Sequence, residues 1–312
     1  MKISIITAVL NRKEFIRAAI ESVLAQDYSD FEHWIIDGGS SDGTLELLKQ
    51  YSHLRLLSEP DRGVFDAWNK GVDRATGELI GILNSDDVYP SGAFHSCTKL
   101  LEKFPAAQVV SGGCQIFRNG PGGVEIEMHR YQSPRRYRLS LRNTTVGLPI
   151  INSRFFRRSV FDQLGRFSLD YPVASDREFL IRAALAGIAD VCSSEIYYRY
   201  RWHSGSNTMN AGNRTMLTGI EDGLEMIRKT REAHALGVAD EEVLLKWKRE
   251  LLATGVMVHA VMKERAKALS LAKESFLADP SWLFTFLRCG ALATGRRVRT
   301  TLRTWRQSAK AK

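Results

Sequence analysis

The sequence LIGILNSDDVY, residues 79–89, passes abruptly from an apolar run, Leu79 to Leu83, to a polar group that ends in Asp86 and Asp87. The apolar run is typical of a buried strand, and the two carboxylates follow where that strand leaves its sheet. Open α/β sheets bind ligands at this edge. Adjacent carboxylates repel each other, so a shared Mg²⁺ or Mn²⁺ would stabilise them, with substrate phosphates completing the shell. The stretch therefore indicates a metal-dependent site for a phosphorylated ligand, although the same residues also favour a solvated turn.

Strands and helices alternate along the first hundred residues. Apolar runs rich in β-branched residues predict strands, and amphipathic runs predict helices between them. The predicted strands are 2–10, 33–36, 54–57 and 79–83, and the predicted helices are 14–24, 44–51, 64–75 and 92–104. This alternation, with short connections, indicates an α/β fold built on a parallel sheet with right-handed crossovers.

The pattern changes after residue 104. Strands are expected over 108–117 and 124–129, and the turn NGPGG between them indicates a hairpin. Residues 130–152 are basic and irregular; helices over 159–164 and 176–186 and a strand over 195–200 are expected to follow. From about Thr215 onward the chain is predicted to be helical, with breaks near Gly237 and Pro280.

The composition is that of an ordinary globular protein, since 44% of the 312 residues are hydrophobic and 25% are charged. The net charge of +9 is uneven, because the chain from Arg288 to Lys312 has basic residues and no acid. A basic tail predicts an anionic partner such as membrane lipid, nucleic acid or an acidic polymer. The four cysteines form no C-x-x-C pair, which argues against a zinc framework and fits a reducing compartment. Without a signal peptide or an apolar run of roughly 18 residues, we expect a cytoplasmic protein, peripheral on the cytoplasmic face of the inner membrane.

Several short motifs follow one another before residue 90. They are Ser4–Ala8 with Asn11, Ser22–Gln26, Ile36–Thr44 (IDGGSSDGT), Ser58–Gly63 (SEPDRG), Asp66–Gly71 (DAWNKG), Ala75–Glu78 (ATGE) and Leu83–Asp87 (LNSDD). In this order and at these spacings, residues 1–207 resemble the family-2 glycosyltransferases, inverting enzymes of the GT-A fold, of the bacterial surface-polysaccharide type. The resemblance implies a Rossmann-like, mostly parallel sheet flanked by helices in residues 1–212, with residues 213–312 as a basic, helical C-terminal region.

The reaction that the resemblance implies is the transfer, with inversion, of a hexosyl or N-acetylhexosaminyl group. The donor would be a nucleotide-sugar, with a UDP-sugar expected, and the cofactor would be Mn²⁺ or Mg²⁺. The acceptor would be a hydroxyl of a glycan or of a lipid-linked sugar in polysaccharide biosynthesis. A sugar-1-phosphate nucleotidyltransferase is disfavoured, because residues 7–15 lack a Gly-rich, Arg-containing loop. The other alternative is a non-catalytic sugar-nucleotide-binding or membrane scaffold protein of the same fold, against which the intact Asp86, Asp87 and Asp176 argue.

By the same resemblance, the nucleotide would lie at the ends of the first two strands. Backbone groups of Thr7, Ala8 and Asn11 would meet the base or the ribose, and Asp37 would accept a hydrogen bond from the uracil ring. From the residues alone, these positions are equally a plain strand–loop junction and a turn-forming aspartate. No G-x-G-x-x-G occurs, which argues against a dinucleotide fold.

Three more residues are candidates for the donor pocket. Arg62, in a glycine-flanked loop, would touch the base or a phosphate, and a solvated surface arginine is the alternative. Asp66 and Asn69 are three apart on one predicted helix and share a face. They would line the pocket, unless they are simply polar residues near the start of a helix.

The metal would be held by the acidic motif and a histidine. Asp87 would bind the divalent ion directly, while Asp86 would contact the ribose or the ion through water. Asn84 stands where the wider family often has Asp, which leaves one carboxylate fewer for the ion. His203, in the turn after the last predicted strand, would approach the diphosphate or the metal; a surface histidine is the alternative.

Inverting transfer needs a general base that takes the proton of the acceptor hydroxyl as its oxygen attacks the anomeric carbon. Asp176 is the candidate, because similar enzymes carry an acid at the start of this helix and an Arg further along it. A helix N-terminus favours the ionised carboxylate, which keeps the base charged but lowers its basicity. Helix capping is the alternative role; Glu178 is the reserve base, and Asp170, in the preceding loop, is a weaker candidate.

The C-terminal segment 281–306 interleaves arginines with Trp282, Trp305 and other apolar residues. Such a pattern suits a helix that lies in a membrane interface, and a polyprenyl-linked acceptor would suit that setting. An amphipathic helix packed on the protein, with its arginines in water, is the alternative. No nucleic-acid recognition module is present, so a nucleic-acid partner is not expected.

Overall fold

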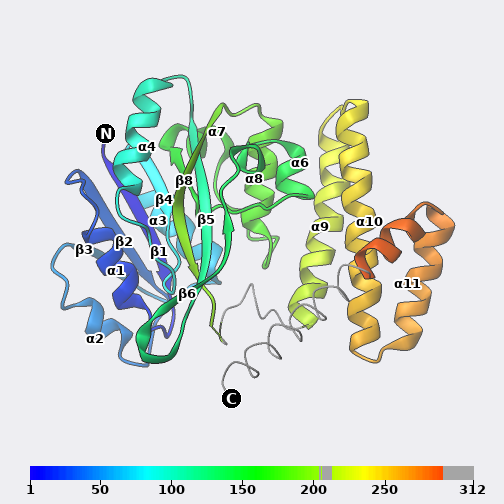
Figure 1. The fold of residues 1–312 in the computed structure, drawn as a ribbon, viewed down its shortest axis with the longest axis horizontal. Coiled ribbons are helices and arrows are strands. Elements are labelled where there is room, and N and C mark those ends of the chain that lie inside the picture. The colour runs from blue at the N-terminus through cyan, green and yellow to red at the C-terminus, as the bar shows by residue number, and fades with distance from the viewer. Residues whose placement is uncertain (204, 206–212, 291–312) are drawn as a thin grey trace, which may run out of the picture. The chain divides into compact units, whose positions relative to one another are not determined.

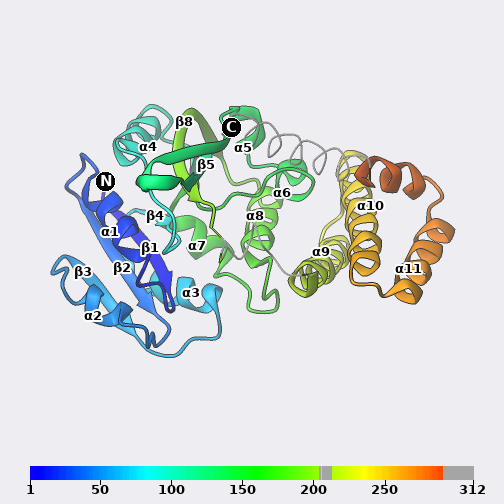
Figure 2. The same cartoon turned by 60° about the horizontal axis from the view of Figure 1, so that its bottom comes forward.

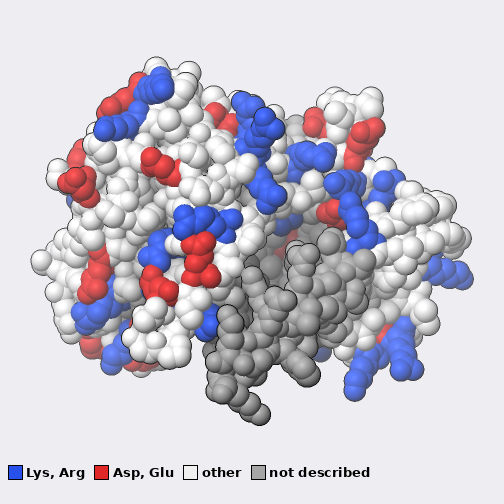
Figure 3. Space-filling view, in the orientation of Figure 1, with Lys and Arg blue, Asp and Glu red and all other residues white. Residues whose placement is uncertain are grey.

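The structure is a computed structural model that describes residues 1–203, 205 and 213–290. The chain divides into two compact units, Met1–Asn210 and Ala211–Lys312. The first unit holds the sheet and the second consists of helices (Figure 1). Over the first unit, acidic and basic side chains are interspersed on the face that Figure 3 shows.

The first half of the sheet is parallel, as the alternation of strands and helices predicts. Its strands are β1 (Ile3–Val9), β2 (Phe31–Asp37), β3 (Leu54–Ser58) and β4 (Leu79–Ile82), in the spatial order β3-β2-β1-β4. Val9 pairs with Asp37, and Asp37 pairs with Ser58. The carboxyl ends of these strands therefore meet at one edge, where open α/β sheets place their ligands.

The second half of the sheet mixes directions. Its strands are β5 (Val109–Asn119), β6 (Glu125–Tyr131), β7 (Arg154–Arg157) and β8 (Asp190–Arg201). Strand β7 lies antiparallel between β4 and β5, β6 forms the predicted hairpin with β5 through the short 3-10 helix η1 (Pro121–Gly123), and β8 runs parallel to β5. Two antiparallel steps restore the direction, so β8 ends at the same edge as β4.

Helices cover both faces of the sheet (Figure 2). One face packs against α1 (Ile16–Leu24), α2 (Thr44–Leu48) and α4 (Ala93–Lys103), and the other against α3 (Val64–Arg74), α7 (Arg158–Leu164) and α8 (Ser175–Leu185). Alternate residues of each strand serve the two cores, since Ile5 faces the first and Ile6 the second. A Cβ at Gly71 would lie 2.4 Å from Ile6 Cγ2, so this glycine lets α3 approach β1 closely. The α/β fold expected from the sequence is confirmed.

The segment expected to be irregular contains two short helices, α5 (Pro134–Tyr137) and α6 (Leu141–Thr145), and then β7. The side chain of Ser140 caps α6 by accepting a hydrogen bond from the backbone N–H of Asn143 at 3.3 Å. Arg154, in β7, is 1% exposed, and its guanidinium donates to Ser111 Oγ. A buried arginine at the start of a four-residue strand hides the apolar pattern by which strands are recognised.

The second unit contains α9 (Asn213–Ala233), α10 (Val238–Val261), α11 (Arg265–Ala278) and a helical segment over 282–290. The breaks near Gly237 and Pro280 are as predicted, and a further break occurs at 262–264, where Lys263 adopts a φ of 62°. Within the described residues, no helix is long and apolar enough to cross a membrane. The predicted interface helix over 281–306 lies outside the described residues from 291 onward.

Candidate active site

The turn after β4 is joined to β8 by the carboxylate of Asp87. This carboxylate is 1% exposed and accepts hydrogen bonds from the Tyr198 hydroxyl at 2.5 Å, the backbone N–H of Arg201 at 2.6 Å and the Asn84 side-chain amide at 3.1 Å. Burial and the neighbouring Asp86 carboxylate raise the pKa of Asp87. Asp87 therefore links the turn after β4 to β8 through buried hydrogen bonds.

Asp86 points the other way, toward the end of β8. Its Oδ2 lies 3.0 Å from Nε2 of His203, and the two side chains are 18% and 15% exposed. The ring of Phe15, at the start of α1, stacks on the imidazole with centroids 4.3 Å apart. Three segments far apart in the sequence thus bring a carboxylate and an imidazole together at the carboxyl edge of the sheet.

The pair formed by Asp86 and His203 fits one side of a divalent-metal site. Carboxylate oxygen and imidazole nitrogen are both common ligands of Mn²⁺-type ions, and Mg²⁺ is usually held by one or two carboxylates with substrate phosphates. Among the described residues, no group of three or more His, Cys, Asp or Glu side chains could hold a metal by itself. The donor set is therefore that of an ion shared with a phosphorylated ligand. Both oxygen atoms of Asp87 already accept hydrogen bonds inside the protein, and the direct contact between Asp87 and the ion stays a prediction.

Asp176 lies in the first turn of α8 and is partly buried. Helix α8 leads through the short turn 186–189 into the start of β8. The backbone N–H of Gln108, next to β5, donates to Ala189 O at 2.8 Å and holds the end of this turn at the sheet. The helix therefore runs antiparallel to β8, and its first turn lies toward the edge that carries Asp86. Asp176 Oδ1 accepts the backbone N–H of Arg177 at 2.8 Å, yet burial outweighs this bond and raises the pKa of Asp176. The lowered basicity expected from the helix N-terminus is thus reversed by burial.

Glu178, the reserve base, is committed to another contact. Its two oxygens accept hydrogen bonds from the Arg182 guanidinium at 2.6 and 2.8 Å. The same guanidinium donates to the backbone carbonyl of Arg166 at 2.8 Å. Glu178 and Arg182 therefore fix the loop that precedes α8, and this leaves Asp176 as the better candidate.

Comparison with known proteins identifies the family. Residues 4–165 match the family model described as glycosyl transferase family 2. The chain belongs to this family. An uncharacterized glycosyltransferase of Mycobacterium tuberculosis is 30% identical over 190 residues, which cover 59% of this chain and 69% of the relative. A PGL/p-HBAD biosynthesis glycosyltransferase of Mycobacterium bovis is 30% identical over 189 residues, covering 57% of this chain and 68% of the relative.

Solved structures agree with the fold. Staphylococcus aureus TarS 1–349 in complex with UDP-GlcNAc superposes with a TM-score of 0.61 at 16% identity, covering 83% of this chain and 81% of TarS. The mannosyltransferase PcManGT of Pyrobaculum calidifontis, in complex with GDP-Man and Mn²⁺, gives a TM-score of 0.62 at 18% identity and covers 96% of this chain and 82% of its own. The GT-A architecture follows for this chain from these structures, and glycosyl transfer follows from its family.

In this glycosyltransferase, Asp37 ends β2 at the carboxyl edge of the sheet. It is fully buried, and its carboxylate accepts hydrogen bonds from the backbone N–H groups of Gly39 and Ser40, at 3.2–3.3 Å, and from Ser58 Oγ at 2.7 Å. These bonds shape the loop after β2 and link it to β3. The contact of Asp37 with the uracil ring stays a prediction.

Another carboxylate lies at the rim of that loop. Asp61, partly buried, covers Gly38 so closely that a Cβ at position 38 would be 2.6 Å from Asp61 Oδ2. Its Oδ1 accepts the backbone N–H of Gly63 at 2.8 Å, which fixes the side chain. Because Gly38 has no side chain, the Asp61 carboxylate of the β3–α3 loop can pack against it. Asp61 was not among the predicted site residues, although the SEPDRG motif contains it.

The predicted contacts at the end of β1 are mixed. Thr7 is fully buried and its Oγ1 lies 3.0 Å from His33 Nε2, so its side chain belongs to the core, while the contact expected of its backbone stays a prediction. Ala8 is partly buried at the same strand end. Asn11, with a φ of 52°, accepts the backbone N–H of Ser41 at 2.8 Å. Asn tolerates this left-handed conformation, and its side chain shapes the loop rather than a pocket wall.

The donor-pocket residues of α3 are also structural. Asp66 is 9% exposed and accepts the backbone N–H of Arg62 at 3.1 Å. Asn69 makes two hydrogen bonds with the backbone of Phe167, at 2.8 and 2.9 Å. Both side chains anchor loops, and their contacts with the donor stay predictions. The Arg62 side chain is 76% exposed, with its guanidinium 3.3 Å from Asp66 Oδ1, so it can still reach a ligand at this edge.

Tyr198, Arg201 and Phe15 belong to the site and were missed. Tyr198 and Arg201 hold Asp87, and the Arg201 guanidinium also donates to the backbone carbonyl of Asp86 at 3.0 Å. The signal was the run YYRYRWH, residues 197–203, because its strand leads to His203 and donates to Asp87 through the Tyr198 side chain and the Arg201 backbone.

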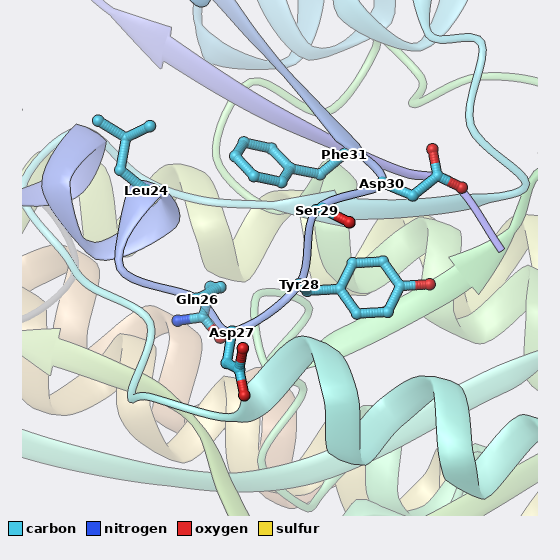
Figure 4. Close-up of a pocket in the computed structure, with 7 residues that line it drawn as sticks. All are labelled: Leu24, Gln26, Asp27, Tyr28, Ser29, Asp30 and Phe31. Carbon is cyan, nitrogen blue, oxygen red and sulfur yellow. The ribbon is translucent and has the colours of Figure 1, made fainter.

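A surface hollow elsewhere is not part of this site. It is lined by Leu24 and by residues 26–31, between α1 and β2 (Figure 4). The Tyr28 hydroxyl there donates to Met1 O at 2.6 Å. The hollow lies at the amino end of β2, which is the sheet edge opposite Asp86.

Proposed function

We propose that this family-2 glycosyltransferase moves a hexosyl or N-acetylhexosaminyl group, with inversion, from a UDP-sugar to an acceptor hydroxyl of a glycan or lipid-linked sugar, in a metal-dependent reaction. The observation that carries the proposal is the pairing of Asp86 with His203 at the carboxyl edge of the sheet. A half-site of this kind needs phosphate oxygens to complete it, and a nucleoside diphosphate supplies them. TarS with UDP-GlcNAc and PcManGT with GDP-Man and Mn²⁺ support a nucleotide-sugar donor and a divalent ion.

Asp86 and His203 would hold the divalent ion, and the ion would offset the charge that grows on the departing diphosphate. Phe15 keeps the imidazole in place by stacking on it. Asp87 fixes the backbone of its neighbour Asp86 through Tyr198 and the Arg201 amide. The three supporting side chains hold the two ligands near the geometry they need, which is what makes a site of few ligands effective.

The nucleotide base would be read by Asp61. A carboxylate accepts a charge-assisted hydrogen bond from a ring N–H, which uracil and guanine offer at neutral pH and adenine and cytosine do not. Asp61 lies against Gly38, at the edge where the ends of β2 and β3 meet. The exposed guanidinium of Arg62, one residue along, would add a contact to the nucleotide.

Asp176 would act as the general base. Its burial raises its pKa, which increases its basicity as long as the working pH stays above that pKa. It would take the proton of the acceptor hydroxyl while that oxygen bonds to the anomeric carbon and the bond to the diphosphate breaks. Inversion follows because attack and departure occur on opposite sides of that carbon.

Donor turnover tests the proposal. The purified chain, with Mn²⁺, is incubated with UDP-glucose, UDP-GlcNAc or GDP-mannose, and release of nucleoside diphosphate is measured. We expect release from a UDP-sugar, and loss of that release in Asp86→Ala. Release from GDP-mannose alone would keep the site and replace the donor. Donor binding without release, even with added lipid-linked sugar acceptors, would favour the scaffold alternative.

A further inference from the structure

The second unit carries large apolar side chains on its outside. Leu269 and Leu277 of α11 are 71% and 70% exposed, and Phe276 is 44% exposed. In the following helical segment, Phe284 and Leu287 are 78% and 59% exposed. Leu283 is 41% exposed as well. Single exposed apolar residues are ordinary, but six large ones between residues 269 and 287 form a concentration that soluble surfaces rarely carry.

On α11 these side chains share one face with basic residues. Arg265, Leu269, Lys273, Phe276 and Leu277 follow the i, i+4, i+8, i+11, i+12 spacing of one helical face, and all are exposed. The opposite face, with the buried Ala268 and Ser275, packs inward. Glu274 is also exposed, and its carboxylate accepts a hydrogen bond from Ser270 Oγ at 2.7 Å. The outer face therefore carries apolar side chains with two basic residues, and one acidic residue adjoins it.

The exposure of Phe284 in the next segment does not result from an incompletely packed core. Trp282 is 3% exposed, and it stacks on Phe286 with ring centroids 5.1 Å apart, within the cluster that includes Ala253 and Val256 of α10. The inner positions are thus already occupied by large side chains. Phe284 and Leu287 lie on the other face of the segment and do not contribute to this cluster.

The charge of the neighbourhood points to the partner. Residues 280–312 contain eight Lys or Arg residues and no acid, and seven of these follow directly after residue 290. In the view of Figure 3, the surface over α11 is largely uncharged, with Lys and Arg side chains at its margin. A second copy of this surface would be repelled by the same positive charges, whereas anionic lipid phosphates are attracted to them.

We propose that the outer surface formed by Leu269, Phe276, Leu277, Phe284 and Leu287 docks this enzyme on the surface of an anionic lipid bilayer. The apolar side chains enter the interface between headgroups and acyl chains, and Arg265 and Lys273 meet phosphates beside them. Stable attachment takes two weak signals together, and this unit has both an apolar face and a basic sequence that follows it. The inference stands independently of the donor and of the chemistry of the active site.

Vesicle flotation with the full chain tests the proposal. We expect co-flotation with phosphatidylcholine vesicles that contain phosphatidylglycerol, and little with phosphatidylcholine alone. The double substitution Leu277→Glu and Phe284→Glu removes two apolar anchors and adds two negative charges, so it should lower the partition coefficient at least about tenfold. Val238→Glu is the matched control, because Val238 is 80% exposed at the start of α10, outside this surface.

Circular dichroism and UDP binding of each variant, with vesicles absent, show that the fold and the donor site are intact. Membrane docking is overturned if the full chain does not float with anionic vesicles. It is also overturned if the double variant floats like the wild type, or if Val238→Glu loses binding to the same extent. A dimer in sedimentation equilibrium that the double variant abolishes would assign the surface to a second copy instead.

Discussion

Two adjacent aspartates are used in opposite ways by this fold. Asp86 faces His203 at the sheet edge, while Asp87 is enclosed by Tyr198 and the backbone of Arg201. Adjacent residues after a strand point to opposite sides, and the partner supplied by β8 determines which one is buried. One carboxylate of the pair is thus open to the sheet edge, and the other supports the turn.

Substituting Asp87 should cost stability. Asp87→Ala would leave the Tyr198 hydroxyl and the Arg201 N–H buried without their acceptor, and each unsatisfied group costs about 1–3 kcal/mol. We expect a lower free energy of unfolding in urea than for the wild type. Tyr198→Phe, which removes one of these donors, should cost less. A variant Asp87→Ala as stable as the wild type would contradict the supporting role.

Substituting Asp176 should affect turnover and leave donor binding unchanged. General-base catalysis contributes about 10²–10⁴-fold, so Asp176→Asn should lose a comparable factor in transfer rate. Glu178→Gln is the matched control on the same helix, since it removes a contact to Arg182 without touching the base. Equal losses in both variants would mean that α8 was disturbed as a whole.

The pH dependence of the transfer rate should also report on Asp176 as the general base. Burial raises the pKa of Asp176 above its ordinary value, so the wild-type rate should rise with pH through this raised pKa. The acidic limb should be absent from the residual activity of Asp176→Asn. An identical acidic limb in that variant would assign the titration to another group.

At the scale of elements, the first strands and the loop after α3 meet at Glu32. This residue of β2 is 4% exposed, and its carboxylate accepts hydrogen bonds from Ser4 Oγ and the Thr76 backbone N–H, both at 2.6 Å. Lys2 and Arg55 lie 3.1 Å away. Burial alone would raise the pKa of Glu32, but these hydrogen bonds outweigh it and lower the pKa to about 2.

Glu32 should therefore make the fold acid-sensitive in a defined window. The folded pKa lies below the ordinary value of 4.5, so the contribution is complete above that value and is lost as the pH falls toward 2. A shift of this size corresponds to about 3 kcal/mol at neutral pH. Glu32→Gln should be less stable at pH 7 and show a shallower decline between pH 5 and pH 2, measured by urea unfolding. Parallel curves for the two proteins would contradict this account.

The elements that local pattern specifies were predictable, and those that depend on distant partners were not. Strands β1 to β4 and their helices follow from apolar periodicity and turn residues. Strand β7 escaped, because its four residues begin with the buried Arg154, whose guanidinium is paired by the Ser111 side chain of β5 and the backbone carbonyl of Ile150. The break at Lys263 escaped because no Gly or Pro marks it.

At the scale of the whole molecule, the site residues also divide into those that local pattern predicts and those that depend on distant partners. The motifs located the sheet edge where Asp86 and His203 meet, since each follows a recognisable strand end, and the roles of Asp86, His203 and Asp176 stay predictions. The local sequence does not predict which carboxylate faces outward. Asp37 is held inward by a hydrogen bond from Ser58, and Asp61, from another loop, packs against Gly38. Such choices depend on pairings across the sheet.

The central claim, that Asp86 and His203 form the protein half of a metal–diphosphate site, is tested most directly by calorimetric titration with UDP, with and without Mn²⁺, of the wild type and of Asp86→Ala. We predict that Mn²⁺ strengthens UDP binding to the wild type by at least about tenfold, roughly 1.4 kcal/mol, and that this enhancement disappears in Asp86→Ala while the fold is retained. Tight UDP binding that is indifferent to Mn²⁺, or an undiminished Mn²⁺ effect in Asp86→Ala, would contradict the claim.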